Sequence, residues 1–125
     1  MGRRPQKIAR AMLPVLAAAC FASSPTRADP PPKGDAEHGA VLFSRYCRGC
    51  HGADGQGDAL VFMPHVSNLT KKDYIENLPD DYLALAISKG GPGIGKSSYM
   101  PAWEGTLSQQ DIQDLIAHIR ALPKY

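Results

Sequence analysis

Apolar side chains recur at helical spacing in two stretches of the chain. Asp35 can cap a helix over residues 36–50, and Ser108 with Asp111 has the pattern of a capping box for a second helix that Pro123 closes. The face of the first helix carries Gly39, Leu42, Phe43 and Tyr46, and that of the second carries Ile112, Leu115, Ile116, Ile119 and Leu122. Both patterns predict amphipathic α-helices.

Two shorter helices are predicted between them. The segment Thr70–Asp73 fits a capping box that opens a helix to about Asn77. Asp80 and Asp81 are expected to cap the next helix, which Gly90 should end. Its apolar face includes Leu83, Ala86 and Ile87. No run alternates convincingly between apolar and polar residues, so the sequence predicts an all-α fold.

The first 28 residues have the pattern of a secretory signal peptide. A basic start without acidic residues precedes an apolar run over residues 11–22, and small residues follow at the expected cleavage site. The run is too short to span a bilayer and contains Pro14. Cys20 lies in a loose lipoprotein-like pattern whose leucine is one position too far upstream. We therefore expect export to the periplasm, with membrane attachment only if Cys20 is lipidated.

Removing residues 1–28 changes the charge of the chain. The remaining residues 29–125 carry 9 basic against 12 acidic side chains, a formal −3, although the whole chain has +2. This balance argues against nucleic-acid binding, which needs a basic surface. It favours partners with a positive docking surface. We expect a Pro-rich lead-in over residues 29–34 and one domain over residues 35–125.

The segment Cys47-Arg48-Gly49-Cys50-His51 carries the strongest chemical signal. Positions i, i+3 and i+4 share one face of a helical turn, so both thiols and the imidazole face one object. C-x-x-C-H is typical of haem c attachment, with two thioethers to the haem and the histidine on the iron. A thioredoxin-like redox pair would need a βαβ pattern, and a structural zinc site would need four ligands. We expect one covalently bound haem c, which would also supply much of the core of so small a domain.

Five residues are candidates for a second iron ligand: Met63, Met100, His38, His65 and His118. His38 and His118 lie within predicted amphipathic helices, where a structural or exposed role is the simpler interpretation. Met63 and His65 follow His51 by only 12 and 14 residues, a short path around a planar macrocycle. Met100 follows by 49 residues, in a Pro-flanked, non-helical segment. Methionine is usually a core filler, but this setting favours Met100 as the ligand.

Residues 90–97, GGPGIGKS, match the phosphate-binding pattern G-x-x-x-x-G-K-[ST]. That site requires a strand before the loop and a helix after it, so that backbone amides converge on phosphate. Here a predicted helix precedes the loop and Tyr99-Met100-Pro101 follows it. We expect no nucleotide binding. A glycine-rich lead that lets the backbone pass close to the haem edge explains the same residues, with Lys96 beside that edge.

Together these motifs resemble class I c-type cytochromes, specifically the small bacterial monohaem electron carriers. The resemblance rests on CRGCH, on Gly39 and Phe43, on SYMPAW and on the closing LIAHIRAL, and it covers nearly all of residues 35–122. It implies a cytochrome c-like fold of three to five helices around the haem, with the first helix packed across the last. It also implies thioethers at Cys47 and Cys50, with His51 and Met100 as axial ligands.

The resemblance leaves two positions open. His118 occupies a place where the family usually has an aromatic residue near the small residue that matches Gly39. The imidazole either fills that role or leaves a looser contact. Pro64 is the position whose carbonyl we expect to orient His51.

The predicted function is a periplasmic one-electron carrier that is not itself an enzyme. Two strong protein ligands on a haem iron favour electron exchange over small-molecule binding. The alternatives are a haem subunit of a redox enzyme complex, or a ligand-binding haem protein in which Met100 is displaceable. Expected partners are a dehydrogenase, a membrane cytochrome complex or a terminal oxidase or reductase. We expect a monomer.

Overall fold

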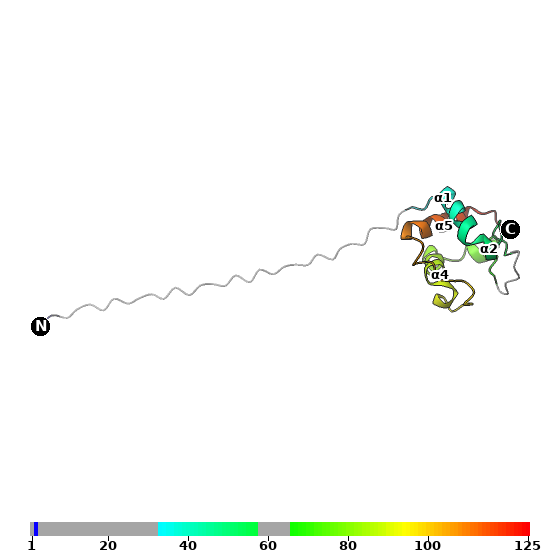
Figure 1. Ribbon diagram of the computed structural model, residues 1–125. Coiled ribbons are helices and arrows are strands. Elements are labelled where there is room, and N and C mark those ends of the chain that lie inside the picture. The colour runs from blue at the N-terminus through cyan, green and yellow to red at the C-terminus, as the bar shows by residue number, and fades with distance from the viewer. Residues whose placement is uncertain (1, 3–32, 58–65) are drawn as a thin grey trace.

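The computed structural model describes residue 2, residues 33–57 and residues 66–125. Helices and turns make up these residues, and no strand occurs among them, as the sequence predicts. The helices form one small cluster (Figure 1). They are α1 (Ala36–Tyr46), α2 (Arg48–His51), α3 (Lys72–Ile75), α4 (Asp80–Gly93) and α5 (Gln109–Ala121).

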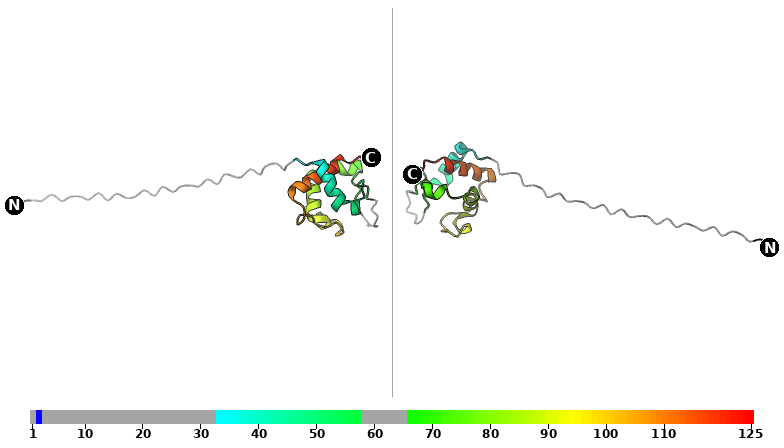
Figure 2. Two further views of the ribbon diagram at one scale, coloured as in Figure 1. Left: turned by 45° about the horizontal axis from the view of Figure 1, so that its top comes forward. Right: turned by 180° about the vertical axis from the view of Figure 1, so that it is seen from behind.

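Helices α1 and α5 cross in close contact and join the two ends of the domain (Figures 1 and 2). The crossing depends on Gly39, where a Cβ would lie 1.9 Å from the carbonyl oxygen of Asp114 and 2.9 Å from the Cβ of His118. The His118 ring packs against Phe43 with ring centroids 5.1 Å apart. The expected packing of the first helix across the last is confirmed, and the imidazole fills the aromatic position.

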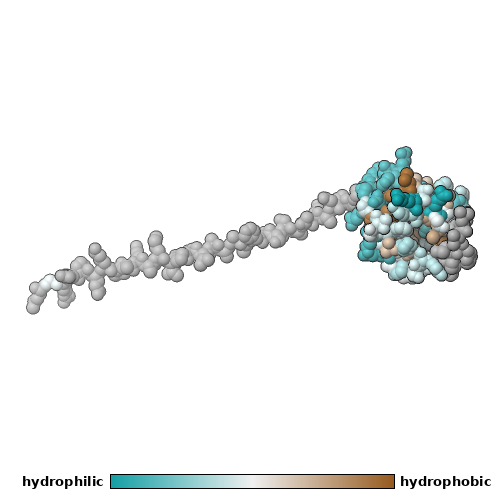
Figure 3. All heavy atoms as spheres, in the orientation of Figure 1, coloured by the Kyte–Doolittle hydropathy of each residue, from teal (hydrophilic) through white to brown (hydrophobic). Residues whose placement is uncertain are grey.

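The core lies among α1, α3, α4 and α5. Phe43, Ile75 and Leu115 are almost completely buried. The other members of the buried cluster are Leu69, Leu83, Ile87, Leu107, Ile112, Ile116 and Ile119. The face seen in Figure 3 is mostly hydrophilic or intermediate, with hydrophobic residues confined to small patches. Cys47 and Met100 pack against this core while remaining partly exposed.

The predicted capping box of α5 is present. The hydroxyl of Ser108 accepts from the backbone N–H of Asp111 at 3.1 Å, and the Asp111 carboxylate accepts from the backbone N–H of Ser108 at 2.8 Å. Helix α4 also ends regular helical geometry at the predicted glycine. Gly90 has φ +69° and ψ −174°, and a short helical turn follows this kink.

Three local predictions are wrong. The helix over residues 36–50 is divided at Cys47, where φ is −112° and the N–H of Cys50 bonds to the Cys47 carbonyl in a tightened turn. Thr70 does not cap α3, because its buried hydroxyl donates to Asn68 Oδ1 at 2.6 Å. That helix starts after Lys71 and is one turn long.

The third correction concerns the start of α4. Pro79 is the N-cap residue there, and neither Asp80 nor Asp81 makes a capping hydrogen bond. The Asp80 carboxylate instead accepts from Arg120 of α5 at 2.7 Å. A tertiary ion pair replaces the predicted local cap.

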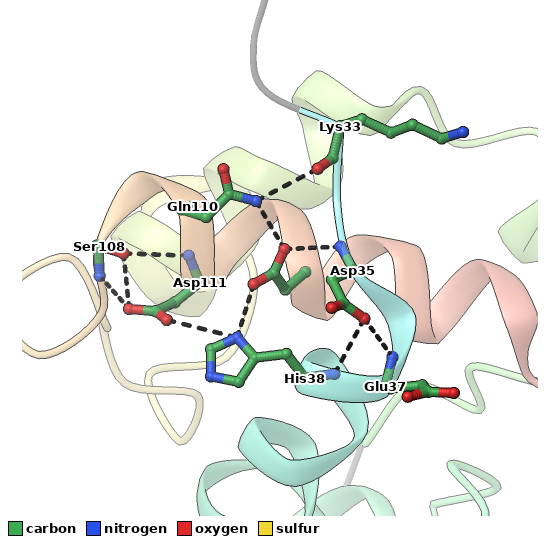
Figure 4. Close-up of polar contacts among 8 residues, drawn as sticks. Lys33, Asp35, Glu37, His38, Ser108, Gln110 and Asp111 are labelled. Atoms are coloured by element: carbon green, nitrogen blue, oxygen red, sulfur yellow. Dashed lines mark hydrogen bonds and ion pairs between the residues drawn. The ribbon is translucent and has the colours of Figure 1, made fainter.

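A buried carboxylate ties the beginning of the domain to α5 (Figure 4). Asp114, 3% exposed, accepts from the backbone N–H of Asp35, from the Gln110 side chain and from Nδ1 of His38, each at 2.7 Å. Asp111 Oδ1 lies 4.0 Å from the same nitrogen of His38. The hydrogen bond to Asp114 raises the pKa of His38 above its ordinary value. Burial raises the pKa of Asp114, but the hydrogen bonds it accepts outweigh burial, so the net shift is downward.

We expect the protein to lose the stabilising effect of this ion pair as pH rises. A histidine with a raised pKa in the fold stabilises fully below its unfolded pKa, about 6.5, and loses this effect as pH passes through the folded pKa. Asp114 stabilises fully above about pH 3.9 and loses its effect as pH falls through its lowered folded pKa. His38→Gln should therefore destabilise more at about pH 5 than at about pH 8, measured by urea denaturation.

Val41→Gln provides the control for this experiment. Val41 is 66% exposed on the same helix and neither residue at this position titrates, so its effect should be equal at both pH values. Equal pH profiles for His38→Gln and Val41→Gln would contradict the ion-pair prediction.

Candidate functional site

The two thiols and the imidazole of the CRGCH segment lie together at α2, beside the core. Nδ1–H of His51 donates to the backbone carbonyl of Ser67 at 3.2 Å. Burial lowers the pKa of His51, and the bond to Ser67 opposes this only partly. The ring is therefore neutral at pH 7, with Nε2 carrying the lone pair that a metal ligand requires.

The carbonyl that orients His51 differs from the expected one. Among the described residues Ser67 accepts the bond. The expected Pro64 lies outside the described residues, as do Met63 and His65. A carbonyl acceptor 16 residues from its histidine carries no sequence signal of its own, because any backbone group could serve.

The Cys47 thiol is poorly suited to redox exchange with other proteins. Burial, followed by the charge of Cys50, raises the pKa of Cys47 to about 12. Reactive dithiol pairs depend on a lowered thiol pKa, because the thiolate is the nucleophile. The thioredoxin-like alternative therefore lacks its chemical requirement.

A cleft opens beside these residues. Its larger part has a volume of about 830 Å³, within the range of about 300–1,000 Å³ typical of ligand and cofactor pockets. A smaller part of about 80 Å³ shares Cys47, His51 and Met100 with it and extends to core residues. The larger part is lined by Tyr46, Cys47, Cys50, His51, Val66, Ser67, Tyr74, Gly91, Ile94, Gly95, Lys96, Ser97, Tyr99, Met100, Pro101 and Trp103.

Among the described candidates for the second iron ligand, Met100 lines the cleft and the two histidines do not. Met100 lines both parts of it together with His51. His38 is engaged with Asp114 at the α1–α5 crossing, and His118 packs on Phe43. Two thiols, a neutral imidazole and a thioether thus share one cleft of suitable size. The residues fit a covalently attached haem.

An aromatic pair at the cleft was not predicted from the sequence. Tyr46, next to Cys47, packs against Trp103, three residues after Met100, with ring centroids 5.2 Å apart. The guanidinium of Arg45 lies 5.3 Å from the Tyr46 ring centroid. The pair joins the thiol-bearing segment to the methionine-bearing segment. The one sequence signal for this contact is that Trp103, in the SYMPAW segment, is aromatic.

The context of residues 90–97 is not that of a phosphate loop. The preceding element is α4, and the next helix, α5, begins at Gln109. The backbone N–H of Lys96 donates to the Gly91 carbonyl at 2.7 Å, and Lys96 lines the cleft. The segment is part of the wall around the thiols and Met100.

Residues 34–119 match the family model described as cytochrome C oxidase, cbb3-type, subunit III. The chain belongs to the cytochrome c family. It is an electron-transport haem protein, and the family implies a haem c. The resemblance to small class I cytochromes is confirmed.

Two curated relatives and one solved structure are similar to this cytochrome. It is 33% identical over 88 residues to the cbb3-type cytochrome c oxidase subunit FixP of Bradyrhizobium, covering 70% of this chain but only 28% of FixP. It is 30% identical to cytochrome c-554(547) of Halothiobacillus neapolitanus, covering 71% of this chain and 98% of that protein. The solved cytochrome c6 of the diatom Phaeodactylum tricornutum has a TM-score of 0.53 and 29% identity, covering 70% and 93%. The cytochrome c fold is confirmed.

Within the described residues, no helix of this cytochrome combines the length and the apolar character needed to cross a bilayer.

Proposed function

We propose that the protein is a periplasmic one-electron carrier that holds one haem c through thioethers at Cys47 and Cys50, with His51 and Met100 as the axial ligands. The observation that carries this proposal is the cleft that these four residues share. When bound, the haem supplies an iron that accepts and returns one electron.

His51 is prepared for ligation by its hydrogen bond. The Ser67 carbonyl fixes the ring orientation and holds the proton on Nδ1, so that Nε2 remains the basic atom. Burial keeps the imidazole neutral, which is the form that ligates metals.

Met100 would set the electronic character of the site. Thioether sulfur is a soft ligand, and its ligation to haem iron raises the reduction potential. Met100 lines the smaller part of the cleft together with apolar side chains, including Ile87 and Leu115. This apolar lining supports a two-ligand site that exchanges electrons.

The location and partners are proposed from the sequence. A signal peptide over residues 1–28, a lead-in over 29–34 and a domain over 35–125 remain predictions, because Cys20 and nearly all of the leader lie outside the described residues. The formal charge of −3 after residue 28 suits redox partners with a positive docking face. These partners would be a dehydrogenase, a membrane cytochrome complex or a terminal oxidase or reductase.

A second candidate is a haem subunit of a redox enzyme complex. The similarity to FixP favours it, although this chain spans 28% of that protein. Purification of the native protein from its host separates the two. A carrier should elute as a free monomer, whereas a subunit should copurify with its complex.

The haem should stay on the denatured protein. Two thioethers do not depend on the fold, so acid and organic solvent should extract no haem, and mass spectrometry should find one haem on the peptide that contains Cys47 and Cys50. Cys20→Ser should leave this result unchanged, whereas replacing Cys47 and Cys50 together by Ala should release the haem. Extraction of haem from the unmodified protein would refute covalent attachment.

A further inference from the structure

At the break in α4, Gly90 and Gly91 contact the segment that carries Met100, and we call this contact surface the seat. With φ +69° and ψ −174°, Gly90 occupies a backbone region open to glycine alone. A Cβ at this position would lie 2.5 Å from the Met100 carbonyl oxygen and 2.7 Å from the Pro101 carbonyl carbon. The backbone of residues 100–101 therefore rests directly on the Cα of Gly90.

Gly91 holds the same segment at a second place. Its backbone N–H donates to the Met100 carbonyl at 3.0 Å. A Cβ on Gly91 would lie 1.8 Å from the Ser97 carbonyl oxygen. Both glycines are buried, so a side chain on either would displace the backbone before or after the methionine.

The last turn of α4 completes the seat. The chain leaves helical geometry at Gly90, so nearby carbonyls lack their intrahelical partners. The Ile87 carbonyl accepts from Trp103 N–H at 3.1 Å, and the Ser88 carbonyl accepts from Glu104 N–H at 3.2 Å. The backbone that follows Met100 is thus bonded to the end of the regular helix.

We propose that Gly90 and Gly91 are positioning residues for Met100, which hold its backbone so that the thioether stays in the cleft with His51. This inference rests on the proposed ligation of haem iron by Met100. It gives the first two glycines of the phosphate-loop-like sequence a purpose that involves no phosphate. The requirement is steric, because the backbone of residues 90–91 contacts the backbone of residues 97–101 with no side chain between them.

Gly90→Ala and Gly91→Ala test the proposal against Gly105→Ala. Gly105 follows Met100 by five residues, does not line the cleft, and has nothing within 4 Å of a Cβ built there. It therefore controls for the added methyl group without a contact to Met100 or to the cleft. Gly90 has a positive φ and Gly91 does not, so the same effect in both variants would not be due to backbone strain. Imidazole is the probe, since it competes for the sixth position of the oxidised iron.

Both variants at the seat should bind imidazole about tenfold or more tightly than the wild type, because their Met100 is held less well. They should also weaken the iron–sulfur absorption band at a helical content that circular dichroism shows to be unchanged. Gly105→Ala should keep the band and bind imidazole within about twofold of the wild type. Equal behaviour of all three variants would overturn the positioning role.

Met100→Ala separates this failure from failure of the proposed function. If Met100→Ala leaves the iron–sulfur band intact, the ligand assignment itself is wrong. If Met100→Ala abolishes the band while Gly90→Ala and Gly91→Ala match Gly105→Ala, only the inference about the seat is wrong.

A measurement on the wild type decides the matter if the glycine variants do not fold. Imidazole that displaces Met100 should accelerate hydrogen exchange at the Gly91 amide, because this amide bonds to the Met100 carbonyl. An unchanged exchange rate would show that the seat and the ligand are not coupled, and would contradict the proposal.

Discussion

Replacing Met100 with alanine should open one side of the haem iron. The iron–sulfur absorption band should disappear, the oxidised iron should move toward high spin, and the reduction potential should fall. The fall should be on the order of 100 mV, a fraction of the roughly 0.8 V over which axial ligands tune haem proteins. The reason is that Met100 shares the cleft with His51, while the other described candidates, His38 and His118, are engaged elsewhere. Optical and magnetic spectra with a redox titration would measure all three effects.

Met63→Ala is the matched control for this experiment. It removes the same thioether from a position only 12 residues after His51, outside the described residues. We expect no change in the band, the spin state or the potential. The assignment would be reversed if Met63→Ala abolished the band and Met100→Ala preserved it. A small ligand that bound tightly to the unmodified protein would instead favour the alternative in which Met100 is displaceable.

Local signals predicted the parts of the fold whose partners are close in sequence. The capping box of Ser108 and Asp111 closes within four residues, so the start of α5 could be predicted without knowledge of the fold. The apolar face of α5 could be predicted because helical spacing alone places Leu115 and Ile119 together. The end of regular helix at Gly90 follows from the conformational freedom of glycine.

Competing partners, one distant and one local, account for two of the wrong predictions. Asp80 has the pattern of a cap, but its carboxylate accepts from Arg120, 40 residues away. Thr70 has the pattern of a cap as well, but its buried hydroxyl donates to Asn68, two residues before it. A capping pattern thus identifies a side chain able to bond to the helix start and does not exclude another partner.

The same reasoning separates the parts of the candidate site. The CRGCH pattern could be recognised because its three groups lie within five residues. The Ser67 carbonyl could not, because its role depends on where the loop returns to His51. The phosphate-loop pattern misled for a related reason. Its glycines at 90 and 91 meet the backbone of residues 97–101, a contact that the linear sequence does not reveal.

Replacing Gly39 with alanine should cause a large loss of stability. In an isolated helix this change would be favourable by up to about 1 kcal/mol, because alanine is the better helix former. Here the new Cβ would lie 1.9 Å from the Asp114 carbonyl oxygen, so α1 and α5 would have to move apart. Overpacking typically costs about 1–3 kcal/mol, and the contact with backbone on the other side gives little room to adapt.

The net loss should be about 2 kcal/mol, or about 8–16 °C in Tm for a domain of this size. Gly105→Ala is the control, because nothing lies within 4 Å of a Cβ at that position, and its effect should stay within about 0.5 kcal/mol. Thermal unfolding followed at the haem absorption and by circular dichroism would measure both variants. The separation of α1 from α5 would also draw Asp114 away from His38, so Gly39→Ala should flatten the pH dependence of stability that this ion pair produces. Unfolding of Gly39→Ala at the same temperature as Gly105→Ala would show that the helix crossing does not depend on the missing side chain.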